Sequence, residues 1–159
     1  MRDAKTASRI DFLLAVWRRL QSARTVALLV RDADTGAPQA QGSGSVAVET
    51  AGGSEMVVRE RGRWTTPRGT GAHFADALRW TLDTDILALR LEHVRHGLDE
   101  PVPLLELVDD GRGFLTPLAP YLCGEDRYEA SVNVVDGVVE VAWRVTGPRK
   151  NQEILRRYR

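Results

Sequence analysis

The spacing of apolar residues changes character once along the chain. Residues 8–22, SRIDFLLAVWRRLQS, carry apolar side chains three and four positions apart, as in an amphipathic helix. Ser8, followed three residues later by Asp11, is typical of a helix start. We therefore expect one N-terminal helix that packs through its apolar face. That face would hold Ile10, Leu13, Leu14, Trp17 and Leu20.

From residue 24 onward, apolar positions recur every second residue in short runs separated by turns. No run between them reads as a crossover helix, which disfavours a parallel βαβ sheet. The clearest hairpin joins two runs through Asp136 and Gly137. We expect an all-β protein with a single antiparallel up-and-down barrel of about nine or ten strands, because closing the barrel removes exposed strand edges. The expected strands are 24–31, 42–49, 55–64, 73–82, 86–95, 102–108, 113–118, 127–135, 138–146 and 151–159.

The same alternation separates the interior of the barrel from its surface, because successive strand residues face opposite sides. Three arginines share one face of 55–64, which must be the solvated one, so Glu60 should point inward. In ILALRLEHVRHG (86–97) the inward row of leucines continues into His93 and Arg95, which should face Glu60 and Tyr128. The inward polar residues would be Glu60, Asp76, His93, Arg95 and Tyr128.

These inward polar groups have two interpretations. Buried charges are unfavourable unless they are paired or hydrogen-bonded, so the groups can form a network that fixes a packed core. They can also line a cavity for a small ligand with an apolar body and a polar or anionic end, since a barrel of this size holds one small ligand. Tryptophans and leucines would then supply the apolar surface. Candidate ligand-binding residues are Glu60, Trp80, His93, Arg95, Tyr128, Trp143, Arg149 and Lys150.

Four segments resemble an uncharacterised family of small bacterial proteins, a domain of unknown function. They are LRWTL, LRLEHVRHGLDEPVPLLELV, LCGEDRYEA and WRVTGPRKNQEILRRYR. The match is best from about residue 78 to 159, and its most specific element is the closing W-R-V-x-G-P-[RK]-K. The resemblance implies a calycin-like or lipocalin-like barrel, with no known activity or cofactor. Tyr121 stands where the family usually has a histidine two positions before Cys123.

The segment TGPRKNQ (146–152) offers cations at a strand break. Arg149 and Lys150 follow Gly147 and Pro148 there, and two cations at a sharp turn can hold a carboxylate or phosphate. The structural alternative is a rigid corner in which the arginine stacks on a tryptophan, as calycin-type barrels often do. Trp17 on the helix would be the partner.

An enzyme using the same cluster is the second hypothesis. Glu60 or His93 would act as general base and Tyr128 as acid or oxyanion donor. Cys123, in a segment that reads as a loop, is expected to be a buried structural thiol rather than a nucleophile. His93 and His96 fall on opposite faces of a strand, so no metal site is expected, and the sequence identifies no cofactor.

Composition narrows the partners. The 159 residues fit one domain, 1–159, with the helix at 8–22 and the barrel at 24–159. The net charge of zero argues against a nucleic-acid partner. A single cysteine and the lack of a signal peptide or long apolar run favour a cytoplasmic protein with no membrane partner. The third hypothesis is a protein-interaction module of unspecified oligomeric state. Its contacts would be Arg18, Arg19, Arg156 and Arg157.

Overall fold

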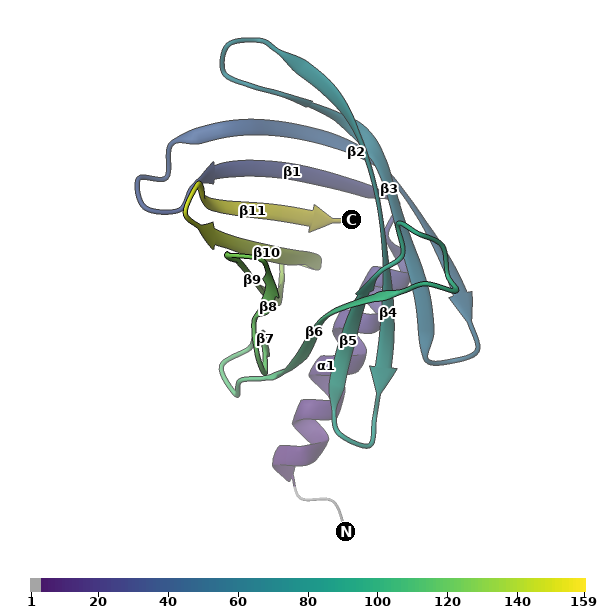
Figure 1. The fold of residues 1–159 in the computed structure, drawn as a ribbon. Coiled ribbons are helices and arrows are strands. Elements are labelled where there is room, and N and C mark those ends of the chain that lie inside the picture. Colours follow the sequence, from purple (N-terminus) through teal and green to yellow (C-terminus); the bar gives the residue numbers. More distant parts are fainter. Residues whose placement is uncertain (1–3) are drawn as a thin grey trace.

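The protein folds as one helix on a closed β-barrel (Figure 1). The structure is a computed structural model that describes residues 4–159. The helix, α1, spans Ala4–Ser22. The strands are β1 (Thr25–Asp32), β2 (Pro38–Ala51), β3 (Glu55–Thr65), β4 (Gly71–Asp83), β5 (Ala88–His93), β6 (Val102–Asp109), β7 (Leu115–Pro117), β8 (Tyr121–Cys123), β9 (Asp126–Val135), β10 (Val138–Gly147) and β11 (Lys150–Tyr158).

Strand pairing follows the chain order around the barrel. Each strand from β1 to β6 pairs antiparallel with the next, β7 meets β9 at Leu115 and Val132, and β9, β10 and β11 continue the series. The ring closes where β11 pairs with β1, with Leu155 opposite Leu29. In the described chain, ten strands form the ring and β8 pairs with β9 alone. The expected all-β, up-and-down barrel with one N-terminal helix is confirmed.

Several element boundaries differ from the sequence prediction. The helix ends at Ser22 as expected but begins at Ala4, so Ser8 lies within it and is not its cap. The strand expected at 86–95 is only Ala88–His93, since Leu87 adopts a positive φ of 54° in the preceding turn. The segment YLCGED, expected as a loop, contains the short strand β8, and Cys123 at its end is exposed rather than buried as expected.

Helix α1 crosses one end of the barrel (Figure 1). Near its start, Arg9 Nε lies 3.9 Å from Asp109 Oδ2 at the end of β6. Near its end, Arg19 Nη1 donates to the carbonyl oxygen of Gly137, 3.0 Å away in the β9–β10 turn. The buried face of the helix consists of Leu13, Val16, Trp17 and Leu20. Ile10 and Leu14, which were expected on this face, are partly exposed, and Val16, which was not expected there, is buried.

Much of the barrel interior is filled by its own side chains. The buried face of α1 packs into one cluster with inward residues of the strands, and Trp80 at its centre is 1% exposed. Burial of such side chains supplies most of the driving force for folding. Other members include Met56, Leu89, Leu91, Leu107, Val132, Val139 and Val141.

Glycines let β2 and β3 approach closely and bend. A Cβ on Gly44 would collide with the backbone of Arg61, and one on Gly62 with the carbonyl of Ser43. Strand glycines commonly mark such close approach and strong curvature. Among residues 4–159, no helix combines the length and apolar character needed to cross a membrane.

Candidate functional site

Four inward side chains form a charged layer inside the barrel. Glu60 on β3 lies opposite Asp76 on β4, and Arg156 and Tyr158 come from β11. Alternation along each strand turns them inward, and Glu60 is only 3% exposed. The expected inward orientation of Glu60 is confirmed.

Arg156 holds both acids of this layer. Its Nη1 donates to Glu60 Oε2 at 2.8 Å and to Asp76 Oδ2 at 3.1 Å. The Tyr158 hydroxyl donates to the other oxygen of Glu60. Asp76 Oδ1 lies 2.9 Å from His93 Nε2 on β5. A continuous polar chain therefore runs from Tyr158 to His93 through side chains of four strands.

The environment shifts the titration of three of these groups. Burial raises the pKa of Glu60, although the Arg156 charge and the Tyr158 hydroxyl oppose the shift. Burial lowers the pKa of Arg156, but the acidic groups of Glu60, Tyr158 and Asp76 together outweigh it, so that the guanidinium titrates above its ordinary range. Burial and the Glu60 charge both raise the pKa of Tyr158. Arg156 therefore stays charged and Tyr158 stays neutral near pH 7.

Both nitrogens of His93 are engaged. Nδ1 accepts the backbone N–H of Arg95 at 2.9 Å, so it carries no proton in this arrangement. The proton of the neutral ring is then on Nε2, facing Asp76. No free lone pair of His93 remains for a metal, a haem iron or a substrate proton.

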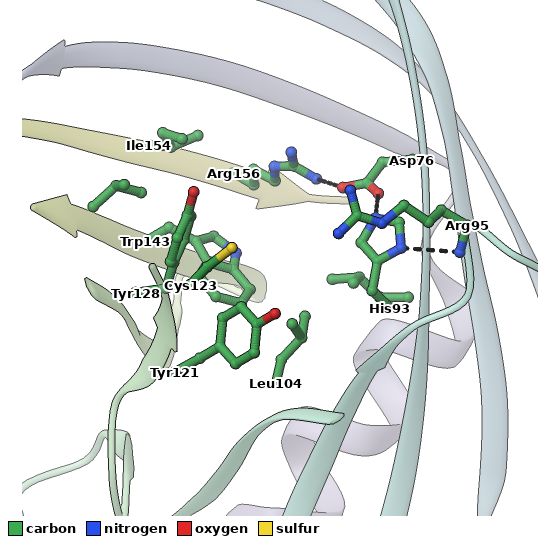
Figure 2. A pocket seen from close by; sticks show the side chains of 12 residues that line it. Asp76, His93, Arg95, Leu104, Tyr121, Cys123, Tyr128, Trp143, Ile154 and Arg156 are labelled. Atoms are coloured by element: carbon green, nitrogen blue, oxygen red, sulfur yellow. Dashed lines mark hydrogen bonds and ion pairs between the residues drawn. The ribbon is translucent and has the colours of Figure 1, made fainter. Parts of the chain in front are cut away.

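A pocket of about 310 Å³ opens beside the charged layer (Figure 2). Asp76, His93, Arg95 and Arg156 form its polar side. The opposite walls are mainly apolar and aromatic, and β8 and β9 contribute Tyr121, Cys123 and Tyr128 to them. The remaining lining residues are Leu78, Leu104, Tyr121, Cys123, Tyr128, Trp143, Val145 and Ile154.

The structure brings some of the candidate binding residues together and separates others. His93, Arg95, Tyr128 and Trp143 all line the pocket. Glu60 does not line it: it lies against Arg156, and it reaches His93 only through Arg156 and Asp76. The prediction that His93 faces Glu60 directly is therefore wrong.

Trp80, Lys150 and Arg149 also lie outside the pocket lining. Trp80 is buried in the packed core. Lys150 Nζ lies 3.1 Å from Asp126 Oδ2 and 3.3 Å from the Tyr128 hydroxyl, so it positions a lining residue from outside. The hydrogen bond to Asp126 raises the pKa of Lys150.

Arg149 is exposed in the turn between β10 and β11. The turn that precedes β10 meets α1 through the bond between Arg19 and Gly137. A ten-residue strand separates the two turns by about 30 Å. The expected stacking of Arg149 on Trp17 is therefore not formed.

Sequence reasoning missed Arg156, which was expected on the surface as part of a protein contact. Its position carried a signal, because Arg156 lies on the same face of β11 as Ile154 and Tyr158, two residues away on either side. Asp76 was expected to point inward but was not assigned to the site. A buried arginine is recognised only when the acids that pair with it are known.

A larger hollow of about 610 Å³ lies over β5, β6 and the loop before β8. Its one arginine and two of its acids already have partners: Arg90 pairs with Glu106 of the same lining at 3.5 Å, and Glu92 pairs with Arg79, outside the lining, at 2.9 Å. The barrel pocket, where charged donors remain without partners, is the better candidate site.

Comparison with known proteins gives a family but no activity. No curated protein matches the chain. A solved structure of a de novo designed, fluorescence-activating β-barrel is similar at 16% sequence identity and a TM-score of 0.42, over 87% of this chain and 93% of that one. The model of a family of unknown function, DUF6314, matches residues 19–159, which confirms the family resemblance seen in the sequence. The chain therefore belongs to DUF6314.

Proposed function

We propose that the barrel pocket binds a small molecule with an apolar body and a polar or anionic end. The observation that supports this most directly is a cavity of about 310 Å³ with an apolar side and a charged side inside one barrel. Ligand cavities typically combine an apolar lining with a few placed polar groups. Leu104, Trp143 and Ile154 would contact the body, and Arg95, Arg156 and His93 would orient the polar end.

The expected partner is thus a small molecule, in the cytoplasm, rather than a nucleic acid or a membrane. No specific observation favours the enzyme alternative, because Glu60 is shielded by Arg156, His93 Nδ1 accepts a hydrogen bond and His93 Nε2 lies against Asp76. Arg156 cannot contribute to the surface that the interaction-module alternative requires, because its side chain points into the barrel and pairs with Glu60. Arg19, another residue of that expected contact surface, already donates a hydrogen bond to the carbonyl oxygen of Gly137.

Two measurements test the proposal. Native mass spectrometry of the protein purified from its own host should show a bound molecule of low mass. Titration with the neutral solvatochromic dye prodan should give saturable, blue-shifted emission with one dye per chain. The absence of both a bound molecule and saturable dye binding would overturn the proposal.

Variants that fill the pocket test whether the dye binds inside the barrel. Leu104→Trp and Ile154→Trp each add bulk to a side chain that lines the cavity, so both should reduce prodan affinity at least about tenfold by steric exclusion. Leu118→Trp is the matched control, because Leu118 is 64% exposed and lies outside this cavity. Unchanged binding in both cavity variants, with folding verified by circular dichroism, would place the dye elsewhere and count against the proposal.

A further inference from the structure

We infer that the pocket selects a small monocarboxylate and that the guanidinium of Arg95 binds the carboxylate group. An alcohol or a dianionic phosphate with the same apolar body should bind more weakly. This inference rests on the proposed function and names the ligand class of the same pocket. It depends on which charged groups of the lining already have partners.

Arg95 is the unpaired cation of the pocket. Its backbone N–H is tied to His93 Nδ1 at 2.9 Å, which fixes the residue at the pocket wall. Figure 2 shows its side chain extending from that wall into the pocket. Within residues 4–159, no carboxylate lies within ion-pair distance of its guanidinium. The planar donors of this group are therefore free to accept a carboxylate in a bidentate manner.

Arg156 supplies a second, partly free guanidinium. Its Nη1 is shared between Glu60 and Asp76, while its buried Nε has no hydrogen-bond partner among the described residues. A buried donor left unpaired is unfavourable. An acceptor atom of a ligand, or a water that the ligand orders, would satisfy it.

The two acids beside Arg156 limit the charge that a ligand can bring. Glu60 and Asp76 face one guanidinium, and Arg95 restores the balance of charge around the pocket. One additional negative charge is attracted by the free donors of Arg95. A second is repelled by both carboxylates. Among the described residues the lining holds no further arginine or lysine, and Lys150, which lies outside it, is paired with Asp126 at 3.1 Å.

Neutral donors on the opposite wall fit a carboxylate as well. Tyr121 and Tyr128, each with a phenol hydroxyl, are lining residues of the pocket. The Tyr128 oxygen accepts a bond from Lys150 Nζ at 3.3 Å, which leaves its own proton available for a ligand oxygen. An ionised carboxylate is an acceptor only, so it matches a lining in which donors are in excess.

The cavity volume sets the size of the body. About 310 Å³ is at the lower end for ligand cavities, which suits an eight-carbon chain or a phenyl group on a short chain. The test therefore uses two matched series: octanoate, octanol and octyl phosphate, and 4-phenylbutanoate, 4-phenylbutanol and 4-phenylbutyl phosphate. Affinities are measured by isothermal titration calorimetry in mildly alkaline buffer, where the phosphates are dianions.

In at least one series the carboxylate should bind about tenfold or more tightly than the alcohol, since hydrogen bonds to charged groups are stronger than neutral ones. It should also bind more tightly than the phosphate. Arg95→Gln should reduce the preference for carboxylate over alcohol to within about twofold. Arg144→Gln, a control on the outer face of β10, should leave that preference unchanged.

Equal binding of alcohol and carboxylate, tighter binding of phosphate, or an unchanged preference in Arg95→Gln would each overturn the inference. If none of the six compounds binds while prodan still binds in the cavity, the monocarboxylate is wrong and the proposed pocket function stands. If prodan binding and a co-purified ligand are also absent, the proposed function fails too.

Discussion

Arg156 on β11 donates from Nη1 to Glu60 Oε2 on β3 across 2.8 Å, and so links two strands that are separated in the ring by β1 and β2. Glu60 is 3% exposed, so this pair is shielded from water. The same guanidinium reaches Asp76, whose other oxygen faces His93 at the pocket wall. A buried structural pair and the lining of the pocket are therefore parts of one network.

Removing Arg156 should strongly destabilise the fold. In Arg156→Met, Glu60 loses its cation while it stays buried, and breaking such pairs typically costs about 3–5 kcal/mol. Equilibrium urea unfolding measures this loss. Arg157→Gln is the control, because Arg157 pairs with Glu140 on the outer face at 3.1 Å and such pairs contribute at most about 1 kcal/mol. Equal losses in the two variants would contradict a special role for the buried pair.

Glu60 should make stability depend on pH. Burial raises its pKa in the folded protein above the ordinary value of 4.5. The folded state therefore holds this proton more tightly than the unfolded chain does. This contribution to stability is full below about pH 4.5 and is lost as the pH rises through the folded-state pKa.

The glutamine side chain in Glu60→Gln cannot titrate, so comparison of this variant with the wild type isolates the contribution of Glu60 to the pH dependence of stability. The unfolding free energy of the wild type minus that of the variant should fall as the pH rises above about 4.5, and then level off. Urea unfolding of both proteins over a series of pH values gives the difference. If the two curves run parallel, Glu60 titrates alike in both states and the prediction is wrong.

The hydrogen bonds of His93 predict a fixed neutral tautomer. Nδ1 accepts from the Arg95 N–H and Nε2 lies 2.9 Å from Asp76 Oδ1, so nitrogen NMR in mildly alkaline buffer should show the proton on Nε2. Asp76→Asn should weaken that preference, because its amide accepts less strongly than a carboxylate. Exposed His73 is the internal control and should show no such dependence on residue 76. A proton on Nδ1 of His93 would contradict the arrangement.

The overall fold was predictable because alternation and turn residues act locally. Asp136 and Gly137 both adopt positive φ, 49° and 80°, as a tight hairpin between two alternating runs requires. The prediction failed where tertiary contacts decide. The pairing of Tyr121 with Tyr128 makes β8 a strand in a segment whose composition indicates a loop.

The candidate site was predictable only in part. Alternation placed Glu60 and His93 inside, but it cannot measure how far apart two inward groups lie around a barrel. Glu60 lies behind Arg156 and outside the pocket lining, while His93 lines the pocket and contacts Asp76. Arg156 was predicted to lie on the surface because arginine side chains are usually exposed, although its position in the strand places it on the inward face.

Close contact between β2 and β3 should make Gly62 intolerant of a side chain. In Gly62→Ala the new Cβ would meet the carbonyl of Ser43 and the Cα of Gly44, both backbone atoms that cannot turn away. Overpacking of this kind costs about 1–3 kcal/mol or more, measured as a lowered thermal midpoint. Gly53→Ala is the control, because nothing lies within 4 Å of its added Cβ, and it should be nearly neutral. A neutral Gly62→Ala would mean that the strands lie further apart.

Cys123 should report pocket occupancy. Its thiol is free and exposed and also lines the pocket, so iodoacetamide should alkylate it at a rate that falls when octanoate or prodan is bound. Leu122 provides the matched control, since it is adjacent on β8, 65% exposed and outside the lining. In Leu122→Cys combined with Cys123→Ser, the same ligand should leave the alkylation rate unchanged. Protection at both positions would indicate a general effect on β8, and protection at neither would place the ligand away from this wall.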